Sequence, residues 1–290
     1  MSEKLKAVLA AIACVFFWGF SFVSSKIALG AFPPMTLGLF RFAMAVGFLF
    51  IIKRRLVPNE KLDKRDIPLL VFSGLAGDTF YFFCENNGLY LLPASEAAII
   101  TASIPVLTLF VDKLTKKAGK TGFRRWFGAA VSMAGVWLVA QVSFSMSGSI
   151  TGYLYLAGSA LCWVVYSFLT RPLFERGRSN IYVVFWQCTA GLAGFLPFAL
   201  FEKPVWQAVN AAVILHTVFL GVFCSALAYL FYARAIKTLG VSAAAVFINF
   251  IPVITVVSGI FVLHEWLAPL QWLGAAVTLA GVCLVMIHAK

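Results

Sequence analysis

Charge is scarce in this sequence. Only 12% of its 290 residues are charged and 62% are hydrophobic, whereas soluble domains carry about 25% charged and 45 to 50% apolar residues. This composition excludes an ordinary soluble domain and predicts a polytopic membrane protein. The net charge of +12 does not indicate a nucleic-acid partner, because most Lys and Arg residues lie in short segments between apolar runs.

Several signatures of catalysis and of metal binding are also missing. The sequence has no G-x4-G-K-[ST] motif, so we do not expect this chain alone to use ATP. It has no CxxC, no HExxH and no Cys/His cluster, and its three histidines lie at the ends of apolar runs. The six cysteines lie inside such runs and are interpreted as small hydrophobic residues. We therefore expect no metal site, no cofactor and no membrane enzyme.

Long apolar runs, by contrast, are abundant. A transmembrane helix needs about 20 predominantly apolar residues. Ten runs approach this length, at residues 7–29, 35–52, 67–91, 95–114, 126–142, 151–170, 181–201, 211–236, 240–263 and 269–288. The first run follows Lys4 and Lys6 but has no small-residue cleavage site, so we interpret it as a span and not as a signal peptide. The predicted fold is an all-α polytopic membrane protein with ten transmembrane helices, numbered here as spans 1 to 10.

Basic residues mark alternate connections between the spans. Segments 53–66, 113–125 and 171–180 contain fifteen Lys and Arg residues, whereas the five intervening connections contain only Lys203. Because Lys and Arg are retained on the cytoplasmic side, both termini are predicted to be cytoplasmic. The sequence also lacks the alternating pattern of outer-membrane strands. The predicted location is therefore an inner or plasma membrane, with the lipid bilayer as a partner.

The chain contains an internal repeat. Segment 74–112 recurs as segment 221–259 at an offset of 147 residues. The matched pairs include Gly74 with Gly221, Ser95 with Ser242, and Pro105 with Pro252. Because each copy has five spans, an odd number, the second copy must enter the membrane from the opposite side. This predicts two inverted five-helix repeats, residues 1–145 and 146–290, with a substrate site between them near the middle of the bilayer.

Spans 5 and 10 share a pattern of small residues. The sequence WFGAAVSMAGVWL in span 5 matches WLGAAVTLAGVCL in span 10. The glycines Gly128 and Gly135, and their counterparts Gly274 and Gly281, lie two turns apart on one face of each helix. We interpret this pattern as close helix packing. A homodimer through spans 5 and 10 is the alternative.

Three motifs carry a resemblance to a known family. They are W-G-x-S-F-V-x-x-K from Trp18, E-N-x-G-L-Y-x-L-P-A-S-E-A-A from Glu85, and H-E-W-L-x-P-L-Q-W-L-G-A-A from His264. With their order, the duplication and the span number, the chain resembles ten-span EamA-type members of the drug/metabolite transporter superfamily over essentially its full length. The resemblance implies a helical bundle with alternating access and a central cavity lined by spans 1, 3, 4, 6, 8 and 9. It also implies export of metabolites or amino acids.

One connection departs from the family pattern. Members often carry an acid between spans 4 and 5, like Glu265 between spans 9 and 10. Here that connection reads LTKKAGKTGFRR and contains no acid. The departure puts a symmetric role for Glu265 in doubt.

Two acids lie deep inside span 3. Asp78, Tyr81 and Glu85 fall at i, i+3 and i+7, so they are predicted to share one helix face. An Asp at the centre of a span costs about 2.5 to 3.5 kcal/mol and usually faces a cavity or a partner. We interpret Asp78 as an amine-binding or proton-carrying carboxylate. A hydrogen-bonded contact between helices is the alternative.

Three charged residues, one of them Glu85, are candidates for a gate. Arg41 and Glu85 each lie six residues inside the same end of their spans, at equal depths of about 9 Å. Equal depth permits an ion pair, which would be structural or would open as an outer gate, and substrate binding by Glu85 is an equal alternative. Lys26 ends span 1 and is interpreted as snorkelling to the interface. The family resemblance adds Lys26 as a gate residue.

Aromatic and polar residues complete the candidate site. An aromatic wall facing Asp78 would suit an amine or an aromatic metabolite through cation–π contact and stacking. Packing or lipid contact is the alternative for each ring. The candidate lining residues, in spans 1, 6, 8 and 9, are Trp18, Ser21, Trp163, Tyr166, Tyr229 and Asn249.

Two prolines fall near the middles of spans 4 and 9. Pro105 and Pro252 each remove a backbone hydrogen bond and are predicted to kink their helices. The freed carbonyls would line the cavity, as in other inverted-repeat transporters. A packing kink is the alternative.

The sequence therefore favours a secondary active transporter that exports a small metabolite, such as an amino acid or an amine, by alternating access. In this interpretation Asp78 binds the substrate or couples a proton. A flippase for lipids or lipid precursors and a passive channel are the alternatives.

Overall fold

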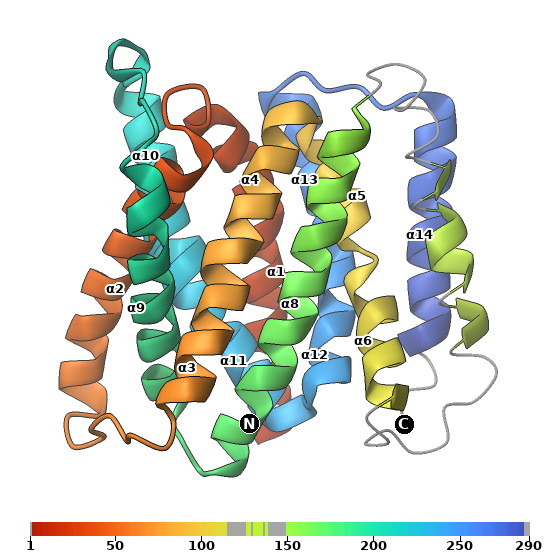
Figure 1. Cartoon of the computed structure of the whole chain (residues 1–290). Coiled ribbons are helices and arrows are strands. Elements are labelled where there is room, and N and C mark those ends of the chain that lie inside the picture. The colour runs from red at the N-terminus through yellow and green to blue at the C-terminus, as the bar shows by residue number, and fades with distance from the viewer. Residues whose placement is uncertain (1, 115–125, 129, 136, 139–148, 287–290) are drawn as a thin grey trace.

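The computed structural model describes residues 2–114, 126–128, 130–135, 137–138 and 149–286. Over these residues the chain is a bundle of helices joined by short connections (Figure 1). The helices of the first half are α1 (Glu3–Ala28), α2 (Pro34–Leu56), α3 (Ile67–Gly74), the π-helical segment η1 (Leu75–Phe80), α4 (Tyr81–Leu91), α5 (Ala94–Thr101) and α6 (Ile104–Leu114). The helices of the second half are α8 (Ile150–Glu175), α9 (Asn180–Ala199), η2 (Trp206–Ala208), α10 (Ala211–Phe219), the π-helical segment η3 (Leu220–Leu227), α11 (Ala228–Leu239), α12 (Val241–Phe247), the short 3-10 turn η4 (Ile248–Phe250), α13 (Ile251–Val262) and α14 (Pro269–Met286).

Eight helical stretches among the described residues are long and apolar enough to cross a membrane. They are α1, α2, α3–η1–α4, α5–α6, α8, α9, α10–η3–α11 and α12–η4–α13, which correspond to the predicted spans 1 to 4 and 6 to 9. Span 5, predicted at 126–142, lies partly outside the described residues. Span 10 corresponds to α14, and its predicted last residues 287 and 288 also lie outside them. The protein is thus an all-helical membrane protein, with eight candidate spans among the residues that the structure describes.

Local sequence signals start and end these helices. The residue before each of four helices accepts a hydrogen bond from a backbone amide three residues later, which satisfies one of the free donors at a helix start. These capping residues are Ser2, Ser149, Ser179 and Asn210. Pro34 begins α2, where a missing amide hydrogen costs nothing. Gly240 joins α11 to α12 with a φ of 88°, a left-handed conformation that favours glycine.

The bundle has two ends with different connections. The basic end, at the bottom of Figure 1, carries the start of α1 and the connections 57–66 and 176–179. The far end, at the top, carries the connections 29–33, 92–93, 200–210 and 263–268. In Figure 1, α1 runs from the basic end to the far end, whereas its counterpart α8 runs from the far end to the basic end. The two halves therefore have opposite orientations.

Equivalent glycines mark the crossings between the halves. A Cβ atom on Gly74 would lie 2.3 Å from the carbonyl oxygen of Gln187 in α9, and one on Gly221 would lie 2.9 Å from the carbonyl oxygen of Arg41 in α2. Gly74 and Gly221 are repeat counterparts, and π-helical segments follow or include them. Span 3 thus packs on span 7 in the same way as span 8 packs on span 2, at crossings too close for a side chain.

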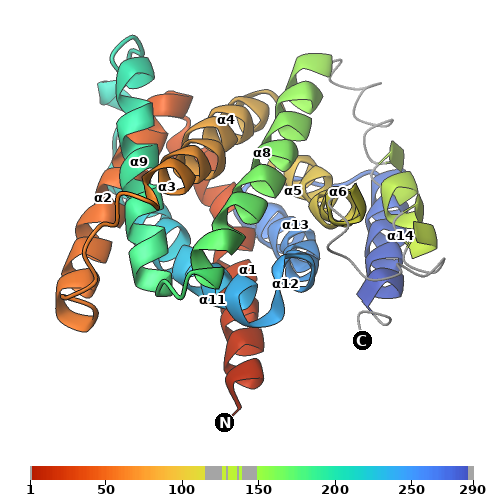
Figure 2. The same ribbon diagram turned by 60° about the horizontal axis from the view of Figure 1, so that its bottom comes forward.

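The glycines of spans 5 and 10 face each other within the chain. A Cβ atom on Gly135 would lie 2.4 Å from the backbone nitrogen of Thr278, and one on Gly281 would lie 2.3 Å from that of Ser132. Figures 1 and 2 show α14 at one edge of the bundle. The close packing predicted from the glycine pattern is confirmed. A homodimer through spans 5 and 10 would have to use other faces of these helices.

Candidate functional site

A small cavity lies between the two halves of the bundle. Its volume is about 20 Å³, which is enough for about one water molecule. Its walls come from spans 1, 2, 3, 4, 6, 8 and 9. The lining residues are Trp18, Ser21, Phe22, Arg41, Tyr81, Phe82, Glu85, Thr101, Ile104, Trp163, Tyr229, Ile248 and Ile251.

Aromatic side chains around this cavity contact one another. The centroid of the Trp163 ring lies 5.0 Å from the rings of Trp18 and Tyr81 and 5.7 Å from that of Tyr229. The arrangements are edge-on or tilted, as aromatic quadrupoles prefer. The Trp18 indole also donates to the carbonyl oxygen of Cys224 at 3.0 Å. The rings therefore form a fixed apolar wall that joins the first repeat to the second.

Arg41 brings a positive charge to this cavity. Its side chain is buried, with 1% exposed. Nε donates to the Ser225 hydroxyl, and the guanidinium lies 4.1 Å from the centroid of the Phe82 ring. Nη1 is buried and has no hydrogen-bond partner among the described residues. A buried donor without a partner is uncommon in native structures, so this group is available to a bound anion.

Glu85 supplies the opposite charge. Its side chain is buried, and its carboxylate accepts a hydrogen bond from the Tyr81 hydroxyl. Arg41 and Glu85 both line the cavity. They nevertheless form none of the ion pairs within 4 Å found in the described part of the chain. The ion pair that their equal depth permits is not formed in this conformation, and each side chain has a neutral partner.

Asp78 does not line the cavity. It lies in η1, fully buried, where a Cβ atom on Gly191 of α9 would come within 2.4 Å of its Cβ atom. Neither carboxylate oxygen has a hydrogen-bond partner among the described residues. The expected common face with Tyr81 and Glu85 assumed an α-helix. Because η1 is π-helical, its wider turn carries Asp78 away from that face and toward α9.

Lys26 closes part of the far end. Its Nζ atom donates to the carbonyl oxygens of Leu89 at 2.5 Å and Leu92 at 2.8 Å, at the end of span 3. A cation there also complements the negative end of the helix dipole. The side chain thus ties the end of span 1 to the end of span 3.

Glu265 closes a second part of the far end. Its carboxylate accepts hydrogen bonds from the backbone nitrogens of Ala94 and Ser95, both at 3.1 Å, and from the Ser95 hydroxyl at 2.9 Å. These donors belong to the start of α5, where amide groups lack partners within the helix. The connection after span 9 is thereby fixed to the start of span 4.

The basic end is open by comparison. A vestibule of about 550 Å³ lies between α6, α8, α11 and α12. Its inner wall reaches Pro105, and the adjacent residue Ile104 lines the central cavity. The vestibule and the central cavity thus have walls at consecutive residues of span 4.

Two segments of the chain match one family model. Residues 5–141 and residues 150–287 each match the EamA-like transporter family. The chain belongs to the EamA-like transporter family. This family, within the drug/metabolite transporter superfamily, consists of transporters and not of enzymes.

Two curated relatives align with this chain over most of their length. The chain is 25% identical to "Uncharacterized transporter YdfC" of Bacillus subtilis (strain 168), over 94% of this chain and 88% of that protein. It is 26% identical to the "Probable terminal-alkyne amino-acid exporter" of Streptantibioticus cattleyicolor, over 97% and 93%. The fold also matches a solved crystal structure with a TM-score of 0.77 and 22% sequence identity. The alignment covers 100% of this chain and 99% of the chain in that structure. At that identity the structural likeness establishes the fold alone.

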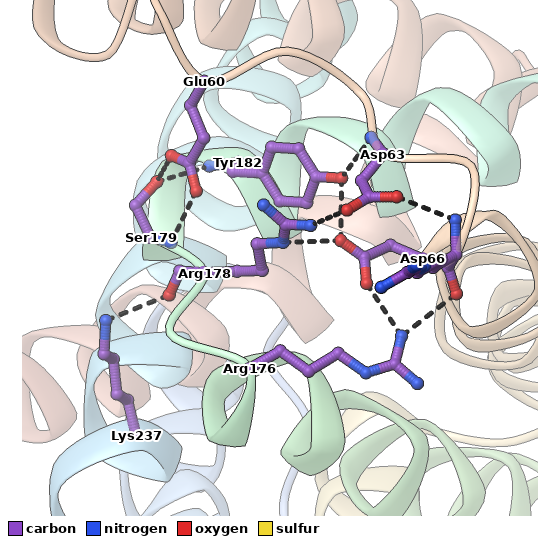
Figure 3. Close-up of polar contacts among 9 residues, drawn as sticks. Glu60, Asp63, Asp66, Arg176, Arg178, Ser179, Tyr182 and Lys237 are labelled. Atoms are coloured by element: carbon purple, nitrogen blue, oxygen red, sulfur yellow. Dashed lines mark hydrogen bonds and ion pairs between the residues drawn. The ribbon is translucent and has the colours of Figure 1, made fainter.

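In this EamA-like transporter, a polar network joins the halves at the basic end (Figure 3). Asp66, which is fully buried, accepts hydrogen bonds from Arg176 at 2.8 Å, Arg178 at 2.6 Å and the Tyr182 hydroxyl at 3.0 Å. The Arg65 amide and the Arg178 guanidinium hold the pKa of the nearby Asp63 below its usual value. The connection before span 3 is therefore fixed to the connection before span 7.

Two carboxylates cap helix starts reciprocally. At the basic end, Glu60 accepts hydrogen bonds from the amide of Ser179, at 3.0 Å, and from its hydroxyl, at the start of α9. At the far end, Glu202 accepts hydrogen bonds from the amides of Met35 and Thr36 at 3.0 and 2.6 Å, at the start of α2. The connection after span 2 thus caps span 7, and the connection after span 7 caps span 2.

The remaining candidate residues lie around the site but outside the cavity lining. Tyr166 is buried against Gly77, and the Tyr166 hydroxyl has no partner among the described residues. The Asn249 side chain is also buried without a partner in that part of the chain. Pro105 and Pro252 each follow an interruption of the α-helix, at residues 102–103 and at η4. The α-helices of spans 4 and 9 are therefore interrupted just before the prolines.

Some lining residues were missed by sequence reasoning. Thr101, Ile104 and Ile251 are ordinary residues of an apolar span and carry no signal that separates cavity lining from packing. Ser225, which accepts from Arg41, could have been found because it is the repeat counterpart of Asp78 at the offset of 147.

Proposed function

We propose that this protein is a secondary active transporter that exports a small zwitterion, such as an amino acid, by alternating access. In this proposal the chain crosses an inner or plasma membrane ten times, with both termini and the basic end in the cytoplasm. The observation that carries the proposal is the presence of both Arg41 and Glu85 in the lining of one aromatic cavity between the repeats.

The charges of the cavity favour an amino acid over a simple amine. A guanidinium forms strong, directional hydrogen bonds with a carboxylate, and Nη1 of Arg41 has no partner among the described residues. Glu85 would then receive the ammonium group, and the rings of Trp18, Trp163 and Tyr229 would surround an apolar side chain. The name of the Streptantibioticus relative, an amino-acid exporter, points to the same class.

The size of the cavity supports a carrier mechanism. At about 20 Å³, it is far smaller than ligand pockets of roughly 300 to 1,000 Å³. A substrate can enter only if spans 4 and 9 move apart from the other spans, and their interruptions beside Pro105 and Pro252 are natural hinges. A passive channel would instead need a continuous path. The closed far end and the vestibule at the basic end fit one stage of an alternating cycle.

Asp78 is proposed to couple a proton to this cycle. An ionised carboxylate without a partner is very costly to bury, so this conformation suits the neutral, protonated acid. Asp78 lies behind the cavity wall, next to Gly77, whose carbonyl oxygen accepts a hydrogen bond from the cavity-lining Tyr229 at 3.1 Å. Loss of its proton would therefore change the field at the substrate-binding guanidinium without contact between Asp78 and the substrate.

The proposal is tested by counterflow in proteoliposomes loaded with a pool of amino acids. We expect labelled apolar or aromatic amino acids to accumulate, and their methyl esters and N-acetyl derivatives to compete at least about tenfold less well, because each removes one charged hydrogen-bonding group. Equal competition by a simple amine would rule out the role of Arg41. Flux without counterflow would indicate a channel, and movement of a labelled lipid alone would indicate a flippase.

A further inference from the structure

The two ends of this inverted repeat are at different stages of opening. At the far end, Lys26 and Glu265 tie the ends of spans 1, 3, 4 and 9 together, and a pocket of about 420 Å³ there lies beside the connection 29–33, with no residue of span 4 or span 9 in its lining. The basic end has a vestibule of about 550 Å³ between spans 4, 6, 8 and 9. In an inverted repeat, each end passes through equivalent conformations during the cycle. The hydrogen bonds that close the far end therefore indicate which residues close the basic end.

The first equivalent pair is Lys26 and Arg171, at an offset of 145. Lys26 donates to the carbonyl oxygens of Leu89 and Leu92. The counterparts of these two residues, Ile236 and Leu239, line the vestibule together with Arg171. Arg171 does not reach their carbonyl groups, because its Nε atom donates to Glu175 at 2.8 Å.

Glu175 itself marks a difference between the ends. Its counterpart at the offset of 145 is Gly30, so Lys26 has no competing acid at the equivalent position. Arg171, by contrast, is held by Glu175 on its own helix. This competition helps to keep the basic end open while the far end is closed.

The second equivalent pair is Gly259 and Asp112, at an offset of 147. A Cβ atom on Gly259 would lie 3.0 Å from the Ser95 hydroxyl and 3.5 Å from Oε2 of Glu265. A side chain at this position would therefore enter the space that the Glu265 carboxylate occupies at the far end. Asp112 presents a carboxylate at the equivalent position of the basic end.

Ser242 is the group that this carboxylate would meet. It is the repeat counterpart of Ser95, and it lines the vestibule with Asp112. The Ser242 hydroxyl is buried and has no hydrogen-bond partner in the described residues. The connection between spans 4 and 5 contains no acid in LTKKAGKTGFRR, so an acid for Ser242 must come from elsewhere.

We propose that Asp112 and Arg171 are the gate residues of the basic end. When this end closes, the Asp112 carboxylate accepts hydrogen bonds from the amide and hydroxyl of Ser242. Arg171 leaves Glu175 and donates to the carbonyl oxygens of Ile236 and Leu239. The acid missing from the connection between spans 4 and 5 is thus replaced by one inside span 4. This gate rests on the alternating access of the proposed function.

The test measures closure of the basic end without measuring transport. Ala243 lines the vestibule, and its counterpart Glu96 is buried at the closed far end, with 6% exposed. A cysteine introduced by Ala243→Cys should react with a maleimide when the basic end is open and be protected when it is closed. Mass spectrometry of the peptide that contains residue 243 separates this reaction from the native cysteines. The purified protein is labelled in detergent, so membrane orientation does not affect the result.

Four further variants and one control are compared in the Ala243→Cys protein. Glu265→Gln weakens the far-end closure and should slow labelling by about tenfold, as expected for loss of hydrogen bonds to a charged group. Adding Asp112→Asn should restore fast labelling, whereas adding Asp112→Glu should leave it slow. Glu175→Gln alone should also slow labelling, because it frees Arg171 to close the gate. Arg55→Gln, at an exposed charged residue of α2, is the control and should change nothing.

The outcomes separate the gate from the proposed function. If Asp112→Asn does not restore labelling in the Glu265→Gln background, or if Glu175→Gln labels like the parent, the gate assignment is overturned and alternating access stands. If Glu265→Gln itself leaves labelling fast, the two ends are not coupled, and both the gate and alternating access are overturned. Variants are compared only when each elutes as a single species, so misfolding does not enter the comparison.

Discussion

The two repeats place similar backbones around the central cavity but give them different side chains. Arg41 of the first repeat corresponds to Gln187 of the second at an offset of 146, and Asp78 corresponds to Ser225 at 147. Arg41 reaches Ser225, whereas the Gln187 amide donates to Ser73 and Thr170 at 2.7 and 2.8 Å. Both charged residues that line the cavity come from the first repeat.

This comparison separates architecture from chemistry. The shared crossings and interruptions give both repeats the same ways to move. The charged residues that line the cavity, by contrast, lie in the first repeat only. In the proposed function these residues decide what is bound, and Asp78 of the same repeat couples the proton. Variants that make one repeat resemble the other therefore test which property belongs to which residue.

The largest effect is expected when the first repeat receives the glutamine of the second. Arg41→Gln keeps a donor for Ser225 but removes the guanidinium. Counterflow of amino acids should fall by roughly 10- to 150-fold, because hydrogen bonds to charged groups contribute about 1.5 to 3 kcal/mol. Arg55→Gln, at an exposed basic residue of the same helix, is the control. Normal flux in a folded Arg41→Gln protein would contradict the proposed substrate site.

A smaller and more selective effect is expected at Asp78. Asp78→Asn should preserve counterflow but abolish accumulation driven by a pH gradient. A gradient of one pH unit is worth ~1.36 kcal/mol per proton, so the accumulation ratio should fall from about tenfold to about one. The measurement compares both assays in the same liposomes, with Asp63→Asn as control. Loss of counterflow together with accumulation would assign Asp78 to substrate binding or to structure.

A weaker effect is expected when the acid of the basic end, Asp112, is introduced at its counterpart in the far end, Gly259. The starting protein carries Ala243→Cys and Glu265→Gln. Adding Gly259→Asp should raise the labelling rate of the cysteine roughly threefold, toward the rate of the protein with Ala243→Cys alone. The gain is partial, because the new side chain starts only 3.0 Å from the Ser95 hydroxyl and a hydrogen bond of imperfect geometry contributes about 0.5 to 1.5 kcal/mol. No gain over Glu265→Gln would show that the two positions are not interchangeable.

The smallest effects are expected at the reciprocal caps. Glu60→Gln and Glu202→Gln should each lower the free energy of unfolding by about 1 kcal/mol, the usual contribution of a helix cap. Because the caps lie at opposite ends, the double variant should be additive. Denaturation in mixed micelles measures the free energies, with exposed Arg55→Gln as reference. If the double variant lost much more free energy of unfolding than the two single variants together, the two ends would unfold as one unit.

The arrangement of the fold followed from the sequence for a physical reason. Lipid requires every span to be apolar and to satisfy its own backbone, so eight predicted spans reappear as helical stretches close to their predicted bounds. The repeat was readable because glycines such as Gly74 and Gly221 occupy crossings that no side chain can enter.

The details of the site were less predictable. The shift of Asp78 off the cavity face depends on η1, and no residue between Leu75 and Phe80 signals a π-helical turn. The hydrogen-bond partners of Arg41 and Glu85 depend on how closely spans 2, 3 and 8 approach one another in this conformation. Equal depth in the membrane could predict that these charges are near each other, but not that each has a neutral partner.

The reciprocal caps also order the events of synthesis. The start of α2 finds its acceptor in Glu202, 166 residues after Thr36, and the start of α9 must reach back to Glu60. While the chain is being made, the first half therefore stays unfinished at its far end until most of the second half has been inserted. A truncated first half would therefore leave the amides of Met35 and Thr36 at the start of α2 without the Glu202 carboxylate.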